Sequence, residues 1–350
     1  MPVADYGKEL VVGALSGALV FSSLFFYTPS VKADDSDKQL RICNDYMTGV
    51  NKIMIKTSGK TFPMFDKYNI NLDDQVKLYE YAKSKDLILF STPFDIESAD
   101  FLNNELDVDC FKIASVDLVN IPLIEHVSKK LKPIIISTGM SKISEIDDAV
   151  ETVKSTGNKD LVLLHCNSSY PSTYAEVNLK FMDTLKKMYN IPVGFSDHTT
   201  DLLSSKVAVS RGANVIERHF TLNKKMEGPD HILSSDKKEM KELIKFKKFF
   251  NKWELWKKTN YKNKKIKESV ELLLGDGIKK IQPNEYITIN SQKKSLYAKN
   301  KIRKGQIIKR RNLEVKGPAG GILPKYINII IGRKAKKKIL QDYPIQWENI

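Results

Sequence analysis

The sequence is poor in cysteine, and its cysteines do not have the spacing of a metal or redox motif. Its 350 residues include only Cys43, Cys110 and Cys166, with no C-x-x-C pair. This pattern excludes a disulfide framework and a structural zinc site, and it favours a reducing compartment. The chain also has no G-x-G-x-x-G stretch after its first strand-like run, which excludes the usual dinucleotide-binding loop.

Acidic side chains are outnumbered, with 57 Lys and Arg against 42 Asp and Glu, and the net charge is +15. Nucleic-acid binding is one meaning of such a surplus. Lysine dominates over arginine, however, and no basic stretch is interleaved with aromatic residues, so we expect no nucleic-acid partner. Solvated basic faces and an anionic small substrate both fit the charge. The apolar fraction of 41% is that of a soluble globular protein, and the length suits one large domain and one small one.

Charge is absent from one stretch near the start of the chain, Leu10 to Tyr27. Its 18 residues are borderline for a membrane span, and SVKA at 30–33 is similar to a signal-peptide cleavage site. Only Lys8 precedes the stretch as a basic side chain, which is weak support for either function. A buried core element and a start foreign to the domain behind it are the other interpretations. We expect a cytoplasmic protein, with membrane contact or anchoring through residues 10–27 as the alternative.

From about residue 87, short apolar runs recur every 22 to 32 residues, and each ends in polar side chains. Helical patterns lie between them, such as the apolar stripe from Ile143 to Val153 that follows Ser141 as a candidate N-cap. Continuously apolar strands alternating with helices predict a parallel sheet covered on both faces. The runs are LILFSTPFD (87–95), CFKIASVD (110–117), PIIISTG (133–139), LVLLHCNSSYP (161–171), VGFSDH (193–198) and VIERHF (215–220).

The ends of these runs favour an α/β fold of the TIM (β/α)₈ barrel type over an open doubly wound sheet. Each of the six ends in Ser, Thr, Asp, His or Lys, and a barrel builds its site from the ends of nearly all its strands. The two missing strands must come from before residue 85, with NKIMIKTS (51–58) and LVVGALSGALV (10–20) as candidates. We divide the chain into an atypical apolar segment (1–40), a barrel (41–255), a linker (256–284) and a small β-rich domain (285–350).

Two histidines, His198 and His219, end neighbouring parallel strands at the catalytic face. Two imidazole nitrogens, with oxygens from substrate and water, suit Mn²⁺, Fe²⁺ or Zn²⁺ in an open site. Taken singly, a histidine at a strand end is more often a satisfied polar residue than a ligand. Hydroxyls recur at the same height and, with Lys112, predict a ring of donors for phosphate and carboxylate oxygens, although helix capping accounts for one or two of them. These are Ser91, Thr92, Ser115, Ser137, Thr138 and Ser196.

In order and spacing, these stretches resemble the sialic acid synthase family over about residues 66–340. The tail KKSLYAK..I.KGQII...NL..KGPAGGI resembles that family's C-terminal antifreeze-like (SAF) domain. The combined set of motifs is highly specific. It consists of FSTPFD, FKIASVDLVNIP, ISTGM, LLHCNSSYP, VNL, VGFSDHT, IERHFTL and GPDH.

The resemblance implies a nonulosonic acid synthase. In that reaction phosphoenolpyruvate condenses with an open-chain N-acyl-hexosamine such as N-acetylmannosamine, giving a nine-carbon 2-keto-3-deoxy acid and phosphate. It implies a divalent metal, usually Mn²⁺ with Mg²⁺ or Co²⁺ as alternatives, held by His198 and His219. The metal would polarise the aldehyde oxygen and orient a water molecule. A domain-swapped homodimer is implied as well. Matching positions for phosphate and carboxylate are Lys112, Thr92, Ser115, Ser137 and Ser196, and those near the sugar are Asn167, Tyr170 and Asp230.

Three departures from the family pattern bear on activity. Asp117 stands where the family has its catalytic glutamate, and this shorter side chain must still come within about 3 Å of its target. Gly317 replaces an arginine that reaches the partner's sugar, and Gly320 replaces an asparagine. The family's first-strand motif, with its glutamate and H-N-G, is not found in residues 1–65, where Lys56 is the candidate for the second strand's lysine. We therefore expect a substrate other than plain N-acetylmannosamine and an activity below the family norm.

Two rival functions stay open at this point. A barrel without the family's first functional strands is compatible with a non-catalytic sugar-phosphate-binding relative, anchored in a membrane by residues 10–27. Another phosphoenolpyruvate-using aldol synthase, such as one making a 3-deoxy-octulosonate, is the second rival. The SAF-like tail and the GPDH stretch at 228–231 argue against it.

Overall fold

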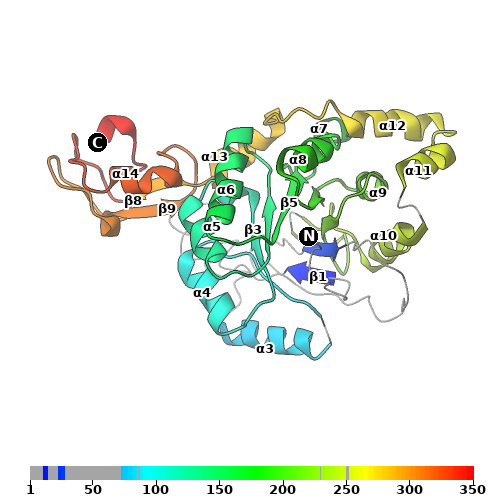
Figure 1. Cartoon of the computed structure of the whole chain (residues 1–350), viewed down its shortest axis with the longest axis horizontal. Coiled ribbons are helices and arrows are strands. Elements are labelled where there is room, and N and C mark those ends of the chain that lie inside the picture. Colours follow the sequence, from blue (N-terminus) through cyan, green and yellow to red (C-terminus); the bar gives the residue numbers. More distant parts are fainter. Residues whose placement is uncertain (1–10, 15–22, 28–71, 86, 229, 250–251) are drawn as a thin grey trace.

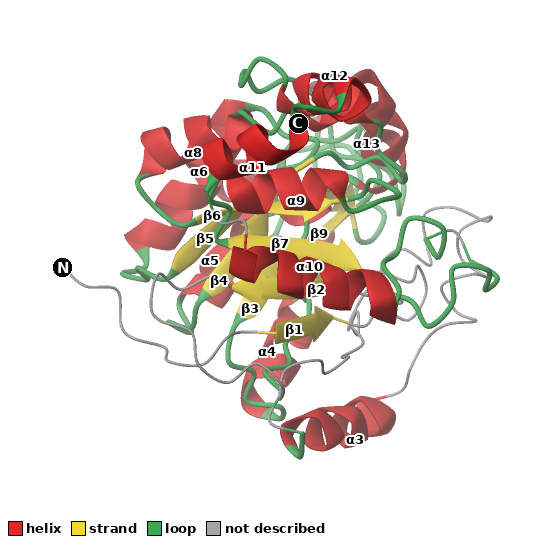
Figure 2. Cartoon of the chain, turned by 90° about the vertical axis from the view of Figure 1, so that its right-hand side faces the viewer, coloured by secondary structure: helices red, strands yellow, loops and turns green. Residues whose placement is uncertain are grey.

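The computed structural model describes residues 11–14, 23–27, 72–85, 87–228, 230–249 and 252–350. A larger body holds a seven-stranded sheet, and a small C-terminal body carries a two-stranded one (Figure 1). The strands of the large sheet lie in the interior of their body, with helices around them (Figure 2).

Five of the predicted strands are confirmed, and they form a continuous parallel sheet that makes up half of a barrel wall. Their order in space is their order in the chain, as expected when each strand returns through a helix beside its predecessor. Their side chains are almost all buried, because this sheet is covered on both faces. The strands are β3 (Phe111–Ile113), β4 (Ile134–Ser137), β5 (Leu161–Cys166), β6 (Val193–Asp197) and β7 (Val215–His219).

The predicted strand at 87–95 is not formed. Leu89, Phe90 and Ser91 are buried, but residues 87–93 make no ladder of backbone hydrogen bonds with β3. Burial therefore explains their apolar character without strand pairing. Asp95 then caps a helix by accepting the backbone N–H of Ser98 at 2.6 Å. The other predicted barrel strand, 51–58, lies outside the described residues.

The apolar stretch near the start contributes two strands, β1 (Val11–Ala14) and β2 (Ser23–Tyr27). They pair antiparallel with each other, and β2 pairs antiparallel with β7, with Ser23 opposite His219. This stretch therefore lies in the sheet, but as an antiparallel neighbour of β7 and not as the parallel first strand we expected. Within the described residues, no helix is both long enough and apolar enough to cross a membrane.

Deletion of residues 1–27 is expected to yield aggregated protein, because it uncovers the edge of β7 and leaves a row of unpaired backbone groups. Soluble yield and size-exclusion chromatography measure the effect. Deletion of residues 1–10 alone is the control, since it leaves β1 and β2 in the chain. A soluble and monodisperse product that melts like the full-length protein would show that β2 is dispensable for the fold.

The helices of the large body cover this sheet and carry its apolar stripes inward. The helix predicted after Ser141 is confirmed as α6, with Ile146, Val150 and Val153 buried, but its N-cap is Lys142. Ser141 instead donates its hydroxyl to the carbonyl of Gly139. The other elements of this body are α3 (Leu72–Lys83), α4 (Ile96–Asn104), η1 (Ser115–Asp117), α5 (Ile121–Ser128), α6 (Ile143–Ser155), α7 (Tyr174–Val177), α8 (Phe181–Tyr189), α9 (Leu203–Ser210) and α10 (Lys237–Phe249).

The predicted linker range, 256–284, contains helical turns that pack on the barrel. The N–H of Leu179 bonds to the carbonyl of Leu273, which fastens this stretch beside α7. The small body beyond has its own core around Leu296, Ile308 and Ile330. Its elements and those leading to it are α11 (Trp253–Asn260), α12 (Lys264–Leu274), η2 (Pro283–Glu285), α13 (Tyr286–Gln292), β8 (Ser295–Ala298), η3 (Arg310–Asn312), β9 (Leu313–Lys316), η4 (Pro324–Tyr326), α14 (Ile327–Ile330) and η5 (Trp347–Asn349).

Candidate active site

Strand alternation decides which polar side chains of β6 and β7 meet. Successive side chains point to opposite faces of a strand, so Glu217 and His219 share one face and Arg218 takes the other. Ser196 lies opposite Glu217 in the register, and Asp197 lies opposite Arg218. The hydroxyl of Ser196 donates to Oε1 of Glu217 at 2.7 Å. Two separate polar clusters follow from this alternation, one on each face of the same two strands.

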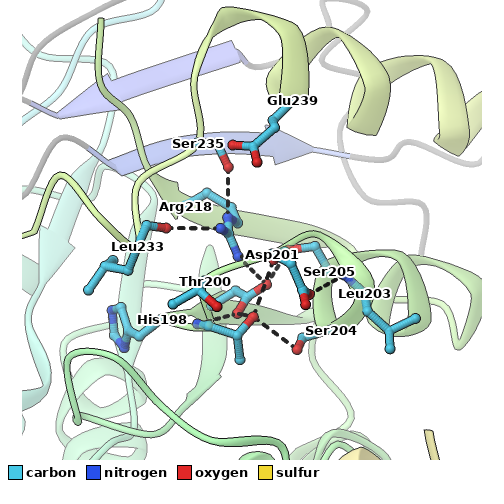
Figure 3. A network of polar contacts seen from close by, with 12 residues as sticks. His198, Thr200, Asp201, Leu203, Ser204, Ser205, Arg218, Leu233, Ser235 and Glu239 are labelled. Atoms are coloured by element: carbon cyan, nitrogen blue, oxygen red, sulfur yellow. Dashed lines mark hydrogen bonds and ion pairs between the residues drawn. The ribbon is translucent and has the colours of Figure 1, made fainter. Parts of the chain in front are cut away.

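The cluster on the outer face is a buried ion pair. Nη1 of Arg218 lies 2.7 Å from Oδ2 of Asp197, and neither side chain is exposed to solvent. Arg218 also donates to the hydroxyl of Ser235 and to the carbonyls of Asp201 and Leu233, as Figure 3 shows. These contacts tie the turn after β6 to the loop at 230–235, so the segments on either side of His198 and His219 are held in place.

The two histidines meet on the inner face. Their ring centroids are 5.1 Å apart with nearly perpendicular planes, and the ring of Tyr170 lies 4.3 Å from His198 and 5.8 Å from His219. Nδ1 of His198 lies 2.7 Å from the carbonyl oxygen of Asn167. A carbonyl can only accept, so Nδ1 carries the proton and Nε2 is the nitrogen left for a ligand. Burial lowers the pKa of His198, but Cys166 and the Asn167 carbonyl outweigh this and raise it.

A carboxylate, Asp230, completes this group. Its Oδ2 lies 3.7 Å from Nδ1 of His219, and it has no hydrogen-bond partner in the described part of the chain. Burial raises the pKa of Asp230 to about 7, against the opposing effect of His198. Imidazole nitrogens with a carboxylate oxygen suit Mn²⁺, so the residues present fit the predicted metal. No cluster of three His, Cys, Asp or Glu side chains in the described residues is arranged to hold a metal ion, so a metal on His198 and His219 would need further ligands from substrate or water.

Lys112 faces the same side of the sheet, on β3. Its Nζ lies 3.3 Å from Oε2 of Glu217, and both side chains are less than one-tenth exposed. Sequence analysis missed Glu217 as a site residue. The strand pattern nevertheless points to it, because side chains two positions apart on a strand lie on the same face. In VIERH the glutamate stands two positions before the histidine.

Some of the predicted hydroxyls have a hydrogen-bond partner in the described residues, and others have none. Ser115 accepts the backbone N–H of Gly139 at 3.0 Å, and Thr138 donates to the carbonyl of Leu164. The hydroxyls of Ser91 and Ser137 are buried without a hydrogen-bond partner among the described residues. A buried hydroxyl without a partner is the kind of group to which a bound ligand is expected to form a hydrogen bond. Thr92 is half-buried.

Asp117 stands apart from the histidines. Its Oδ1 accepts a hydrogen bond from Asn120 at 2.8 Å, and Oδ2 lies 3.8 Å from Nζ of Lys294. Burial raises its pKa from 3.8 to about 6, although Lys294 opposes the shift. In the described residues Asp117 forms no hydrogen bond or ion pair with Lys112 or Glu217, so its predicted catalytic role stays a prediction.

Replacing Asp117 with asparagine is expected to flatten the pH dependence of stability between about pH 4 and pH 6. The folded state holds this proton more tightly than the unfolded state, so the contribution of Asp117 to stability is most favourable below pH 4 and falls as the pH rises to 6. A shift of two pKa units corresponds to about 3 kcal/mol. Denaturant unfolding across this range tests it, with the exposed Asp109→Asn as control. An unchanged slope in the Asp117→Asn protein would contradict the assignment.

Gly317, which stands at the family's arginine position, has a structural reason to be glycine. A Cβ at this position would lie 2.7 Å from the carbonyl oxygen of Gln292, which is backbone and cannot turn aside. The strand pair β8–β9 ends here, with Ser295 opposite Lys316. Close packing of two backbones therefore leaves no room for a side chain at this position.

Known families match this chain in two segments. Residues 38–253 match the model of the NeuB family, and residues 293–350 match the SAF domain. The N,N'-diacetyllegionaminic acid synthase of Campylobacter jejuni is 39% identical over 80% of this chain and 78% of its own.

Two solved structures extend the likeness to the fold. One is the spore coat polysaccharide biosynthesis protein of Bacillus subtilis, with a TM-score of 0.73, 26% identity and coverage of 87% of this chain and 85% of its own. The other is the N-acetylneuraminic acid (sialic acid) synthetase of Leptospira borgpetersenii, with a TM-score of 0.56, 28% identity and coverage of 70% and 78%. The predicted barrel with a C-terminal SAF domain is thereby confirmed.

Proposed function

Because the chain belongs to the NeuB family, and its relatives include nonulosonic acid synthases, we propose that it condenses phosphoenolpyruvate with an N-acetylmannosamine-like N-acyl-hexosamine and releases phosphate. An enzyme of this type is a phosphoenolpyruvate-dependent C–C bond-forming transferase. One observation carries the proposal. The neighbouring strands β6 and β7 bring His198 and His219 together on one face of the sheet, and Lys112 of β3 pairs with Glu217 on that same face.

Phosphoenolpyruvate is assigned to the end of the sheet lined by Lys112 and the strand-end hydroxyls. Lys112 supplies a cation for phosphate or carboxylate, and Ser196 is already oriented by Glu217. Ser137 brings a buried hydroxyl in need of a partner. Ser115 and Thr92 complete the proposed set. When the anion binds, Lys112 can leave Glu217 for it, and Glu217 then becomes a candidate to hold a proton during the reaction.

The sugar is assigned to the end carrying Asn167, Tyr170 and Asp230. His198 and His219 would hold the divalent metal, proposed to be Mn²⁺ with Mg²⁺ or Co²⁺ as alternatives. When bound, that metal supplies Lewis-acid polarisation of the aldehyde oxygen. Asp230 lies beside His219, and with a pKa of about 7 its carboxyl could exchange a proton with a sugar hydroxyl bound there near neutral pH. The ring of Tyr170 packs against both imidazole rings.

We further propose a cytoplasmic homodimer in which the SAF domains are exchanged. Because residue 317 is glycine and not arginine, this chain would make a weaker contact to the partner's sugar across the dimer interface. This supports a substrate other than plain N-acetylmannosamine.

The proposal is tested by phosphate release from phosphoenolpyruvate with a panel of N-acyl-hexosamines, with Mn²⁺ present or removed by a chelator. Release that needs both the sugar and the metal supports a synthase. Binding of phosphoenolpyruvate and sugar without turnover under any of these conditions would favour a non-catalytic relative instead. Release with arabinose 5-phosphate but with no hexosamine would favour an octulosonate-type synthase.

A further inference from the structure

Residues 282–294, here called the strap, join the barrel to the SAF domain and close over two loops at the carboxyl ends of β4 and β5. The hydroxyl of Thr288 donates to the carbonyl of Ser168 at 2.9 Å. Nζ of Lys293 donates to the carbonyl of Met140 at 2.8 Å and pairs with Glu145. Met140 has a φ of 55°, which is unusual for a residue with a Cβ, so the strap holds a strained turn in place.

Glu285 is the most buried charged group of the strap, with 1% of its surface exposed. Its Oε1 accepts the backbone N–H groups of Met140 at 2.7 Å and Ser168 at 3.0 Å, and Oε2 accepts that of Gln282 at 2.9 Å. Burying a charge is costly, and an apolar contact would fasten a linker at lower cost. The charge therefore calls for an explanation beyond attachment of the strap.

A single peptide group connects Glu285 with His198. The N–H of Ser168 and the carbonyl of Asn167 belong to the same peptide unit. Glu285 accepts from the first, and the second accepts from Nδ1 of His198 at 2.7 Å. A carboxylate that accepts from one side of an amide polarises it and makes its carbonyl a stronger acceptor. The chain of contacts is thus carboxylate, peptide, imidazole.

We propose that Glu285 is a positioning residue that acts through this peptide to hold the Nδ1 proton of His198, so that Nε2 faces the metal position. The inference rests on the proposed function only in assigning a metal to His198. Metal-ligating histidines commonly give their other ring N–H to a carboxylate or a backbone carbonyl, and here the two are combined in series. Through the hydrogen bond between Glu285 and Ser168, the strap becomes part of the site.

The test compares full-length Glu285→Gln with wild type by two measurements. The first is Mn²⁺ affinity, which we expect to weaken about 10- to 100-fold. The second needs no metal and follows the exchange of the His198 Nδ1 proton with water by NMR. We expect it to be about tenfold faster in Glu285→Gln, because the acceptor is weaker. Two control variants loosen the same strap without touching the peptide: Glu145→Gln removes the partner of Lys293, and Thr288→Val removes the bond to the Ser168 carbonyl.

The outcomes separate this inference from the proposed function. Weaker Mn²⁺ binding and faster exchange in Glu285→Gln alone support the peptide relay. Equal effects in the controls would reduce Glu285 to a structural anchor and overturn the inference, as would wild-type exchange in Glu285→Gln. If wild type binds no Mn²⁺, the metal of the proposed function is refuted, and the exchange rates still decide whether Glu285 acts on His198.

Discussion

The His219→Ala protein is expected to lose the proposed synthase activity by a factor on the order of 10³, because it lacks one of the two imidazoles that would hold the proposed metal, which would supply several kcal/mol of transition-state stabilisation. His219 is buried at the end of β7, 5.1 Å from the ring of His198. Only the imidazole of His198 would remain, and Asp230 would lose the histidine that lies 3.7 Å from it.

Stability should change far less than activity. A strand-end side chain adds little to the core, so we expect the free energy of unfolding to fall by less than about 2 kcal/mol. Phosphate release, Mn²⁺ content and thermal melting measure the three quantities on one preparation. His126→Ala is the matched control, because His126 lies on α5, where it is half-buried and pairs with Asp100 of α4. Full metal occupancy together with full activity in His219→Ala would refute the assignment.

The Lys112→Met protein should have two defects with different causes. Glu217 would keep its buried carboxylate without the cation 3.3 Å away, and breaking a buried pair in this way costs about 3–5 kcal/mol. Loss of a charged hydrogen bond to phosphoenolpyruvate should raise its KM about 10- to 100-fold and leave the sugar KM nearly unchanged.

The double variant Lys112→Met with Glu217→Gln separates these defects. Removing the unpaired charge should restore most of the stability, while the phosphoenolpyruvate KM should stay high. Lys129→Met, which breaks the exposed pair with Glu125, should cost less than about 1 kcal/mol. A double variant as unstable as Lys112→Met would show that the pair is not the cause. An unchanged phosphoenolpyruvate KM would make Lys112 a structural residue.

Local sequence patterns were sufficient for the parallel strands and for the position of the histidines. Runs such as LVLLHC and VGFSDH are apolar on both faces and end in polar residues, and this combination depends only on neighbours within a few positions. His198 and His219 follow from the same patterns, because strand ends of a parallel sheet meet at one edge. The family resemblance comes from the same stretches, since they contain the residues that the chemistry needs.

The tertiary structure alone decided which partners these side chains have. Lys112 and Glu217 are 105 positions apart, and Glu285 lies 117 positions beyond Ser168, so no local pattern predicts either contact. The antiparallel pairing of β2 with β7 is of the same kind, because an apolar run fits a membrane, a core helix or a sheet edge equally well until a free edge is available to it. Residues 87–93 show the opposite case, because their apolar sequence favours a strand but they are buried without pairing to one. A strand needs a partner strand as well as residues with a high strand propensity.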